Sequence, residues 1–555
     1  MPPKFPKRFL YLLGAILVIN ILQAAYTELI FDEAYYWHYA KHIAFGYFDH
    51  PPMVAWMIRA GSLLFDGELG VRFISCLFSV GTLAVLWCTI DTVHKNRFVP
   101  HFFIVAFSMT LLNAYGFFTL PDTPLLFFTA LFLWSYKKFI ASPSILIAVG
   151  MGLVMAGLMY SKYHAVLVIL FVILSNVRLL TNKLAWLAVL VALLAYVPHF
   201  LWLYEHDFVS ILYHLFERPN GAYRFEKYTL GYFVNLIAIL GLTFPWVYRA
   251  VFKTKAKDPF TKALLYLTYG VLLFFFVSSF NRRVQTQWII VVSIPLVVLV
   301  FKQLIQDPVT RKWMVRMGIA NIMILLYLRI GLAIPALFPV HYESHDNERW
   351  TGELQNEIGK GPVVFENSYR LAPMYAFYTG NETFSLNNIN YRQNQYSIDD
   401  SEAKIQDKDV YYISRYMAKE PVVFRNIKDE AFYGKKIPHF ESYRKLRVYL
   451  EDKKFALSND GPHLLKVYNP YDKPIALDKL TFGIAYTNDY KRVKKVLPLQ
   501  TVLQDTKKTA LMANDTTYFT FTFPKTTFKD PGYFRIGLSG NGLHVGLNGK
   551  TTKLE

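Results

Sequence analysis

The chain has 555 residues, of which 54% are hydrophobic and 17% aromatic, and its formal net charge is +19. This length is too great for one ordinary globular domain. The charge does not indicate a nucleic-acid partner, because the basic residues lie mainly in short segments between long apolar runs. The two cysteines, Cys76 and Cys88, share one apolar run. Twelve residues of helix separate them by about 18 Å, too far for a disulfide.

Apolar runs follow one another up to about residue 340, and many approach the ~20 residues needed to span a bilayer. We therefore predict a polytopic α-helical membrane domain over residues 1–340 and a soluble domain over residues 341–555. Eleven spans are expected, at residues 9–29, 71–92, 99–118, 122–136, 144–160, 164–178, 184–204, 229–249, 262–280, 285–301 and 314–336.

Loop charges predict the orientation of these spans. The basic N-terminus, MPPKFPKR, lacks a cleavage site and is interpreted as a cytoplasmic flank. Alternate loops after it are rich in Lys and Arg, as the positive-inside rule requires of cytoplasmic loops. This assignment places the first outer loop, residues 31–70, and the whole soluble domain on the outer face of the membrane.

The soluble domain begins near residue 341 and shows ordinary alternation of polar and apolar residues. Residues 361–386 predict a strand, a helix and a strand, and KDVYYIS predicts another strand. The last part of the chain is typical of antiparallel β structure, with Asn541-Gly542 and Asn548-Gly549 at hairpin-turn positions. The domain is therefore expected to be mixed α/β and then β-rich.

The first outer loop carries the strongest functional signal, because it places Asp32, Glu33, Asp49 and His50 just outside the first span. Ionisable groups at a membrane surface are costly unless they bind or react with something. Adjacent helical residues point about 100° apart, so one of Asp32 and Glu33 can face a cavity as a general base while the other makes a structural bond. The alternative is that both acids simply favour a helix N-terminus.

Two further motifs in this region have alternative interpretations. Asp49 and His50 precede a rigid Pro pair and could bind a phosphate or a metal, or could mark only a junction between loop and helix. Arg72 lies four residues after Glu68, which by itself favours a helical ion pair. In the functional alternative, Arg72 reaches back to the loop of Asp32.

Other charged residues lie where the topology predicts outer-face turns. Asp122 stands between two prolines and could be a helix cap. A single Lys at such a turn is usually a snorkelling anchor. As a set, however, the outer-face basic residues suggest a site for an anion at the outer leaflet, with candidates Lys162, His214, Arg218, Arg282 and Arg283. The loop with His214 and Arg218 also reads as an amphipathic interfacial helix.

Five motifs in order, FDEAYYW, GYFDHPPM, GELGVRF, LPDTPLLFF and GLMYSKYHAV, resemble the GT-C glycosyltransferases of the protein O-mannosyltransferase superfamily (glycosyltransferase family 39). Bacterial members of this family include the lipid A aminoarabinose transferase. The resemblance covers roughly residues 5–340. It implies transfer of a sugar from a polyprenyl-phosphate carrier to a lipid or protein.

The resemblance also implies roles for individual residues. Asp32 matches the catalytic carboxylate of the first loop, Glu33 its acidic neighbour and Asp122 a second cavity carboxylate. The residues that match donor-site or metal-site positions are Arg72, Tyr36, Tyr47 and Asp49, the last as a metal ligand. His50 and Tyr35 stand where the aminoarabinose transferase has Lys and Arg, so Lys162, Arg218, Arg282 and Arg283 are candidates to supply positive charge for the donor phosphate.

From these observations we expect an inverting, integral-membrane glycosyltransferase in which Asp32 activates the acceptor and basic residues stabilise the leaving phosphate. Its expected partners are the polyprenyl-phosphate-sugar donor, a lipid or protein acceptor and membrane lipids. No cofactor is required, and a divalent metal is optional. The alternative is a transporter or flippase of lipid-linked saccharides, which would normally have polar or broken helices near the membrane midplane.

Overall fold

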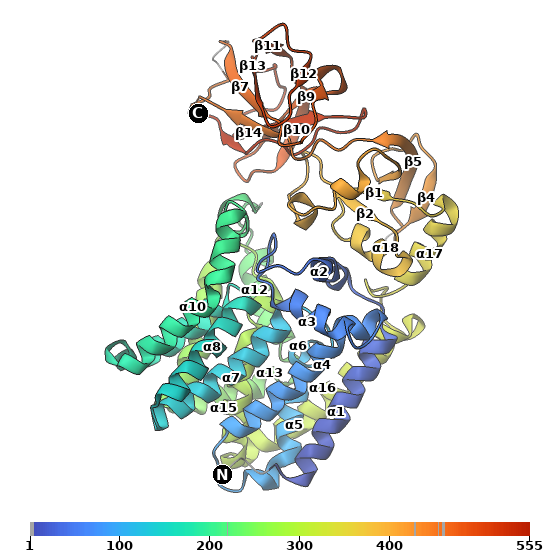
Figure 1. Cartoon of the computed structure of the whole chain (residues 1–555). Helices are drawn as coiled ribbons and strands as arrows, with labels where there is room; N and C mark the ends of the chain where they lie inside the picture. Colours follow the sequence, from blue (N-terminus) through green and yellow to red (C-terminus); the bar gives the residue numbers. More distant parts are fainter. Residues whose placement is uncertain (1–4, 219, 427–428, 453, 458–460) are drawn as a thin grey trace. The chain divides into compact units, whose positions relative to one another are not determined.

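The computed structural model describes residues 5–218, 220–426, 429–452, 454–457 and 461–555. It divides into two compact units: Met1–Ser210 with Tyr223–His345, and Ile211–Ala222 with Asp346–Glu555. The first unit is helical, whereas strands occur in the second (Figure 1).

The first half of the helical unit begins with α1 (Lys7–Tyr26), two short helices and a long α4 (Gly67–Thr89). The short helices, α2 (Phe31–Lys41) and α3 (Met53–Ser62), form the loop between α1 and α4, at the end of the unit opposite the N-terminus (Figure 1). The helices that follow are α5 (Val99–Phe107), α6 (Thr110–Ala114), α7 (Asp122–Ala141), α8 (Ile145–Ser161), α9 (Ala165–Ser175), α10 (Lys183–Glu205) and α11 (Val209–Leu212).

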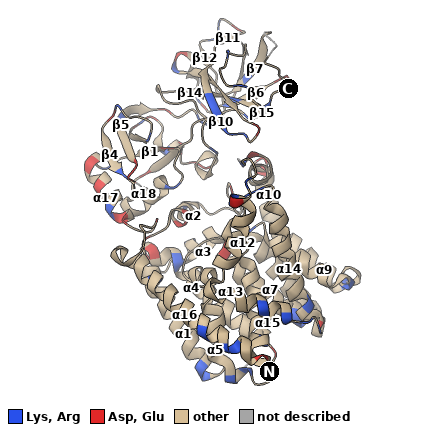
Figure 2. Ribbon diagram, turned by 180° about the vertical axis from the view of Figure 1, so that it is seen from behind, with Lys and Arg blue, Asp and Glu red and all other residues tan. Residues whose placement is uncertain are grey.

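The second half of the unit contains α12 (Gly231–Ala238), α13 (Phe244–Lys253), α14 (Pro259–Ser278), α15 (Ser293–Gln306) and α16 (Pro308–Ala333). Side chains cap several of these helices. Asp258 accepts a hydrogen bond from the Thr261 N–H at the start of α14. Asp307 accepts one from the Thr310 N–H at the start of α16. Lys and Arg gather at the end of the unit that carries the N-terminus (Figure 2), as expected if this end is cytoplasmic.

Each expected span coincides with one or more helices, but the number eleven is not confirmed. Among the described residues, α1, α4, α10, α14 and α16 are long and apolar enough to cross a membrane. A sixth span would be the pair Glu226–Ala238 and Gly241–Lys253, which is bent by 96°. Three apolar helices are shorter, Ile145–Ser161, Ala165–Ser175 and Ile290–Gln306.

Two of the expected spans, residues 99–118 and 229–249, are interrupted, and both interruptions contact the buried side chain of Asn321. Its Nδ2 donates to the Ser108 carbonyl at 2.5 Å, and its Oδ1 accepts the Leu242 N–H at 3.2 Å. Gly241 has φ +57°, and a Cβ there would come within 2.4 Å of the Asn321 amide. The break therefore needs glycine, both for its backbone conformation and for the space.

Apolar side chains fill the core of the helical unit and also cover part of its surface. Buried Trp87, Phe102 and Phe301 pack edge to face in its core. Leu190, Leu194 and other residues of α10 are exposed. Such a surface suits a helix in contact with lipid.

The second unit contains a five-stranded sheet in the order β2-β1-β3-β5-β4. β1 pairs in parallel with β2 and β3, and β5 is antiparallel to β3 and β4. The elements are α17 (Asn347–Ile358), β1 (Val363–Glu366), α18 (Leu371–Thr379), β2 (Thr383–Leu386), β3 (Lys408–Ser414), β4 (Val422–Arg425) and β5 (Ala431–Phe440). The predicted strand, helix and strand over residues 361–386 and the strand KDVYYIS are confirmed.

The rest of this unit is β structure, in sheets of order β10-β9-β14-β15, β11-β13-β7-β6 and β12-β8. The strands are β6 (Arg447–Leu450), β7 (His463–Tyr468), β8 (Ile475–Ala476), β9 (Thr481–Thr487), β10 (Val493–Pro498), β11 (Thr501–Leu503), β12 (Ala510–Leu511), β13 (Thr516–Phe521), β14 (Tyr533–Ser539) and β15 (Thr552–Lys553). Asn541 and Gly542 have φ 54° and 63°, as the predicted turn requires. The side chain of Asn548 instead accepts the Leu538 N–H and donates to the Leu446 carbonyl.

Candidate functional site

Glu33 on α2 and Arg72 on α4 form a buried, bidentate ion pair. Arg72 Nε donates to Glu33 Oε1 at 2.8 Å, and Nη2 donates to Oε2 at 2.5 Å. Both side chains are fully buried. The remaining Arg72 N–H groups donate to the carbonyls of Ala24, Thr27 and Glu28. Arg72 therefore uses all five of its N–H groups inside the protein, and a phosphate contact would require one of these bonds to break.

Glu33 also fixes two backbone segments. Its Oε1 accepts the Thr119 N–H at 2.8 Å, and its Oε2 accepts the Ile30 N–H at 3.2 Å, which caps α2. Each carboxylate oxygen thus accepts two hydrogen bonds. A general base needs a free lone pair that faces the acceptor, so this geometry favours a positioning role for Glu33 rather than proton abstraction.

Asp32 precedes Glu33 on α2 and is only partly buried. Buried Tyr115 lies within electrostatic range of both Asp122 and Asp32. Tyr342, in the segment after α16, lies within electrostatic range of Asp32 and Glu33. Burial and the charges of Glu343, Glu33 and Asp32 raise the pKa of Tyr342 to about 12. The structure therefore brings the two expected carboxylates, Asp32 and Asp122, to one phenol, and places a second phenol beside Asp32.

Asp122 and Lys162 form a second ion pair, between the first turn of α7 and the end of α8. Lys162 Nζ donates to Asp122 Oδ1 at 2.6 Å, and the side chains are 8% and 4% exposed, respectively. An ammonium group has three N–H donors. Asp122 uses one of them, so Lys162 keeps donors for a phosphate oxygen.

Aromatic residues of the first outer loop pack around Asp49. The Tyr39 hydroxyl donates to Asp49 Oδ1 at 2.5 Å, and the Tyr39 ring stacks on Tyr47 with centroids 4.3 Å apart. Tyr36 contacts His50 edge to face at 5.4 Å. Four residues predicted to bind the donor or a metal, Tyr36, Tyr47, Asp49 and His50, thus lie together in one aromatic cluster.

Residues from α10 and α11 hold this loop against the helices. His199 Nδ1 donates to the Phe45 carbonyl at 2.6 Å, and Nε2 accepts from the Tyr163 hydroxyl at 3.2 Å. Ser210 Oγ donates to the Tyr47 carbonyl at 2.8 Å. Tyr163 follows Lys162 directly, so the aromatic cluster and the Asp122–Lys162 pair belong to one connected network.

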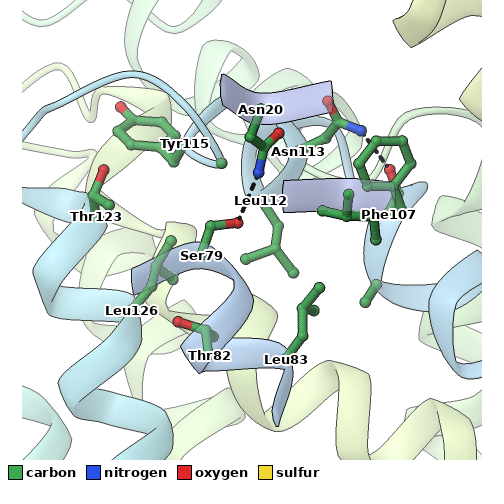
Figure 3. Close-up of a pocket in the computed structure, with 13 residues that line it drawn as sticks. Asn20, Ser79, Thr82, Leu83, Phe107, Leu112, Asn113, Tyr115, Thr123 and Leu126 are labelled. Carbon is green, nitrogen blue, oxygen red and sulfur yellow. Dashed lines mark hydrogen bonds between the residues drawn. The ribbon is translucent and has the colours of Figure 1, made fainter. Parts of the chain in front are cut away.

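A small cavity in the helical unit is lined by Tyr115 together with mostly apolar side chains (Figure 3). Its volume is about 20 Å³, enough for one or two water molecules. Asn20 and Ser79 line it and are hydrogen-bonded to each other at 3.4 Å. Buried Arg329 binds the side chains of Asn20 and Asn113 at 2.8–3.0 Å. These bonds fix the segment that carries Tyr115.

Four predicted basic residues are not joined to this network by the contacts above. Arg282 and Arg283 lie in the turn after α14, and Arg283 is exposed. His214 and Arg218 belong to the segment Ile211–Ala222, which is part of the second unit. The role of these four residues in phosphate binding stays a prediction.

The metal role of Asp49 is likewise untested. Within the described ranges, no group of three or more His, Cys, Asp or Glu side chains could hold a metal ion. Asp49 has one neighbouring imidazole, His50, and already accepts the Tyr39 hydroxyl.

Several residues of this network were missed from the sequence: Thr119, Tyr39, Tyr115, Tyr163, His199, Arg329 and Tyr342. Most are aromatic or neutral residues in a chain with 38 Tyr and 46 Phe, so composition gives no signal. Arg329 could have been found from the sequence, because a lone charge inside an apolar run marks a functional or strongly bonded position.

The chain resembles a known protein family and a curated relative. The family described as dolichyl-phosphate-mannose-protein mannosyltransferase matches residues 49–202. The lipid A galacturonosyltransferase RgtD of Rhizobium johnstonii is 24% identical over 278 residues, a match that covers 47% of this chain and 58% of that protein. The chain thus matches less than two thirds of the length of this relative.

Two crystal structures of ArnT from Cupriavidus metallidurans share the fold. The apo structure matches with a TM-score of 0.54 at 13% identity, and covers 77% of this chain and 97% of ArnT. The structure bound to undecaprenyl phosphate matches with a TM-score of 0.55 at 14% identity, and covers 78% and 98%, respectively. The predicted fold class, a polytopic helical protein with a C-terminal α/β and β-rich part, is confirmed.

Proposed function

We propose that this chain, a relative of the GT-C glycosyltransferases, transfers a sugar from a polyprenyl-phosphate carrier to a lipid or protein acceptor. The reaction takes place on the outer, periplasmic face of a bacterial inner membrane and inverts the anomeric carbon. The family match, the relative that acts on lipid A and the ArnT-like fold support this proposal. The sugar and the acceptor are not specified by it.

The difference between two adjacent acids carries the assignment of the base. Glu33 is fully buried and accepts four hydrogen bonds, whereas Asp32 is partly exposed. Asp32 therefore takes the proton from the acceptor hydroxyl or amine. The acceptor atom then bonds to the anomeric carbon, and the bond from this carbon to the phosphate oxygen breaks, so that polyprenyl phosphate leaves with the electron pair.

Negative charge develops on the departing phosphate, and preorganised donors there would lower the barrier. Lys162 is the best placed cation in the helical unit, because Asp122 orients it while its other N–H groups remain available. Tyr36, Tyr47 and His50 are proposed to complete the donor site. Lys162 would then replace the positive charge that Tyr35 and His50 do not provide, and no metal is required.

One observation favours the alternative of a transporter. The helix pair Glu226–Ala238 and Gly241–Lys253 is broken, and broken helices are common in transporters. This bent pair is thus one feature that the sequence analysis expected of a transporter. The buried carboxylate cluster at one end of the helices is still better suited to chemistry on one face.

The proposed base is tested by an Asp32→Asn variant in lipid nanodiscs. Carrier binding should be kept, while transfer should fall by more than ~10²-fold, as expected for a general base. Asp66→Asn is the matched control, because Asp66 is an exposed acid of the same outer loop whose side chain does not cap α4. Normal turnover in Asp32→Asn would contradict the assignment and move the base to another acid.

A further inference from the structure

The second unit contains its own cavity, within the unit and separate in sequence from the motifs of the first outer loop. Its volume is about 40 Å³, room for a few water molecules or one small polar group. It is lined by Glu366 at the end of β1, Asn388 after β2, Arg444 before β6, and His544 after β14.

Arg444 is 9% exposed and lies in the wall of this cavity. Its Nε and Nη2 are buried and have no hydrogen-bond partner among the residues that the structure describes. Its guanidinium lies over the Phe384 ring, 5.4 Å from the centroid. A buried cation without a partner is unfavourable, so this group is arranged to meet an acceptor that the protein does not supply.

The nearby acids do not fill this role. Oε1 of Glu402 accepts the backbone N–H of Arg444 at 3.2 Å and the Tyr471 hydroxyl at 3.0 Å, whereas Oε2 is buried and has no hydrogen-bond partner among the described residues. Glu441 pairs with Lys473 at 3.0 Å and with Lys479 at 2.6 Å. Glu441 is thus already paired, and neither Glu402 nor Glu441 forms an ion pair with the side chain of Arg444 among the residues that the structure describes.

Glu366, another residue of the cavity wall, is hydrogen-bonded to side chains of the same unit. Glu366 accepts hydrogen bonds from Asn388 at 2.7 Å, from Ser414, and from His544 Nδ1 at 2.7 Å. The His544 side chain is 49% exposed. The carboxylate is therefore already hydrogen-bonded to three side chains, and Arg444 is not among them.

We infer that this cavity binds an oxyanion, a phosphate or a carboxylate group, through the guanidinium of Arg444. Guanidinium groups bind both groups in a bidentate way. The oxyanion can be free or can belong to a sugar. If the oxyanion is part of the acceptor's glycan, that assignment rests on the proposed function. The inference that the cavity binds an oxyanion does not rest on it.

The test measures binding to the full-length protein in nanodiscs, in an Asp32→Asn, Lys162→Ala background that removes turnover and the proposed phosphate contact of the helical unit. The probes are glucose 1-phosphate, glucuronate, inorganic phosphate and glucose at constant ionic strength. Arg444→Met should bind at least one oxyanion at least tenfold more weakly than the parent protein. Arg447→Met, an exposed Arg on β6, is the matched control and should bind like the parent.

The source of the group follows from the affinities of the parent protein. Tighter binding of glucose 1-phosphate or glucuronate than of inorganic phosphate would support a sugar-linked group, and equal binding would support a free anion. Equal affinities in folded Arg444→Met and parent would overturn the inference, as would binding of glucose as tight as that of glucose 1-phosphate. If Arg444→Met does not fold, Arg444→Gln is measured against the same criteria.

Discussion

Lys162 and Arg283 are both basic residues that the sequence assigns to the outer face, but their surroundings differ. Lys162 is buried and oriented by Asp122, whereas Arg283 is exposed in a turn. Lys162→Met should weaken binding of undecaprenyl phosphate by about 1.5–3 kcal/mol, or roughly 10- to 150-fold. Arg283→Met tests whether the exposed residue also contacts the phosphate, as predicted, in which case binding should weaken to a similar extent. Carrier binding to the purified variants checks both.

The loss of Lys162 also leaves Asp122 buried without its counter-ion, so a folding defect must be separated from a binding defect. The double variant Asp122→Asn, Lys162→Met removes both charges and serves as the control. It should fold better than Lys162→Met but bind the carrier no better. Restored binding in the double variant would mean that Lys162 does not contact the phosphate.

Arg72 is expected to act on stability. Arg72→Met leaves the Glu33 carboxylate fully buried and unpaired, and breaking such a pair typically costs about 3–5 kcal/mol. Thermal unfolding in detergent should show a large loss for Arg72→Met and a partial recovery when Glu33→Gln is added. No recovery would mean that the carbonyl contacts of Arg72, rather than the ion pair, carry its effect.

At the scale of single elements, the sequence located helices well and their interruptions poorly. Apolar runs marked α1, α4, α10, α14 and α16 because length and hydropathy are local properties. The breaks near Ser108 and Gly241 depend on Asn321, which lies far along the chain. A tertiary hydrogen bond of this kind leaves no local signal.

The sequence also located the acids of the site but not the contacts that they make. The motif places Asp32 and Glu33 correctly after the first span, but it does not say which of the two is bonded. Arg72 reads locally as a partner of Glu68, whereas the fold brings it to Glu33. Tyr342 could not be predicted, because it meets the acids only through the path of the chain after α16.

In the second unit, β1 ends at Glu366, whose contact with His544 links the five-stranded sheet to the segment after β14. This pair predicts a pH dependence of stability. The hydrogen bond that His544 donates to Glu366 raises the pKa of His544 above the ordinary 6.5. Burial raises the pKa of Glu366, but hydrogen bonds from His544, Ser414 and Asn388 outweigh this effect. The pKa of Glu366 therefore lies below the ordinary 4.5.

The sign of each contribution follows from these directions. The raised pKa of His544 stabilises the fold fully below about pH 6.5, and this is lost as the pH rises through the folded-state pKa. The lowered pKa of Glu366 stabilises it above about pH 4.5, and this is lost as the pH falls through the folded-state pKa. His544→Gln should therefore lower the unfolding temperature more at pH 5.5 than at pH 9. An equal difference at both values would exclude the charged pair.

At the scale of the whole molecule, the loop charges predict that the second unit lies outside the cell membrane. Thr506 is exposed in this unit, and Asn96 is exposed in a predicted cytoplasmic loop. With Cys76 and Cys88 replaced by Ala, a membrane-impermeant thiol reagent should label Thr506→Cys in intact spheroplasts and Asn96→Cys only after lysis. The reverse pattern would overturn the orientation and the outer-leaflet donor.

The central claim is that a sugar is transferred and not merely moved across the bilayer. The most direct measurement is mass spectrometry of the lipids in vesicles that contain the purified chain, polyprenyl-phosphate-linked sugars and candidate acceptor lipids. We predict release of polyprenyl phosphate together with an acceptor that is heavier by one sugar residue, and neither product with Asp32→Asn. An intact carrier that only changes leaflet, at the same rate in Asp32→Asn, would contradict the account.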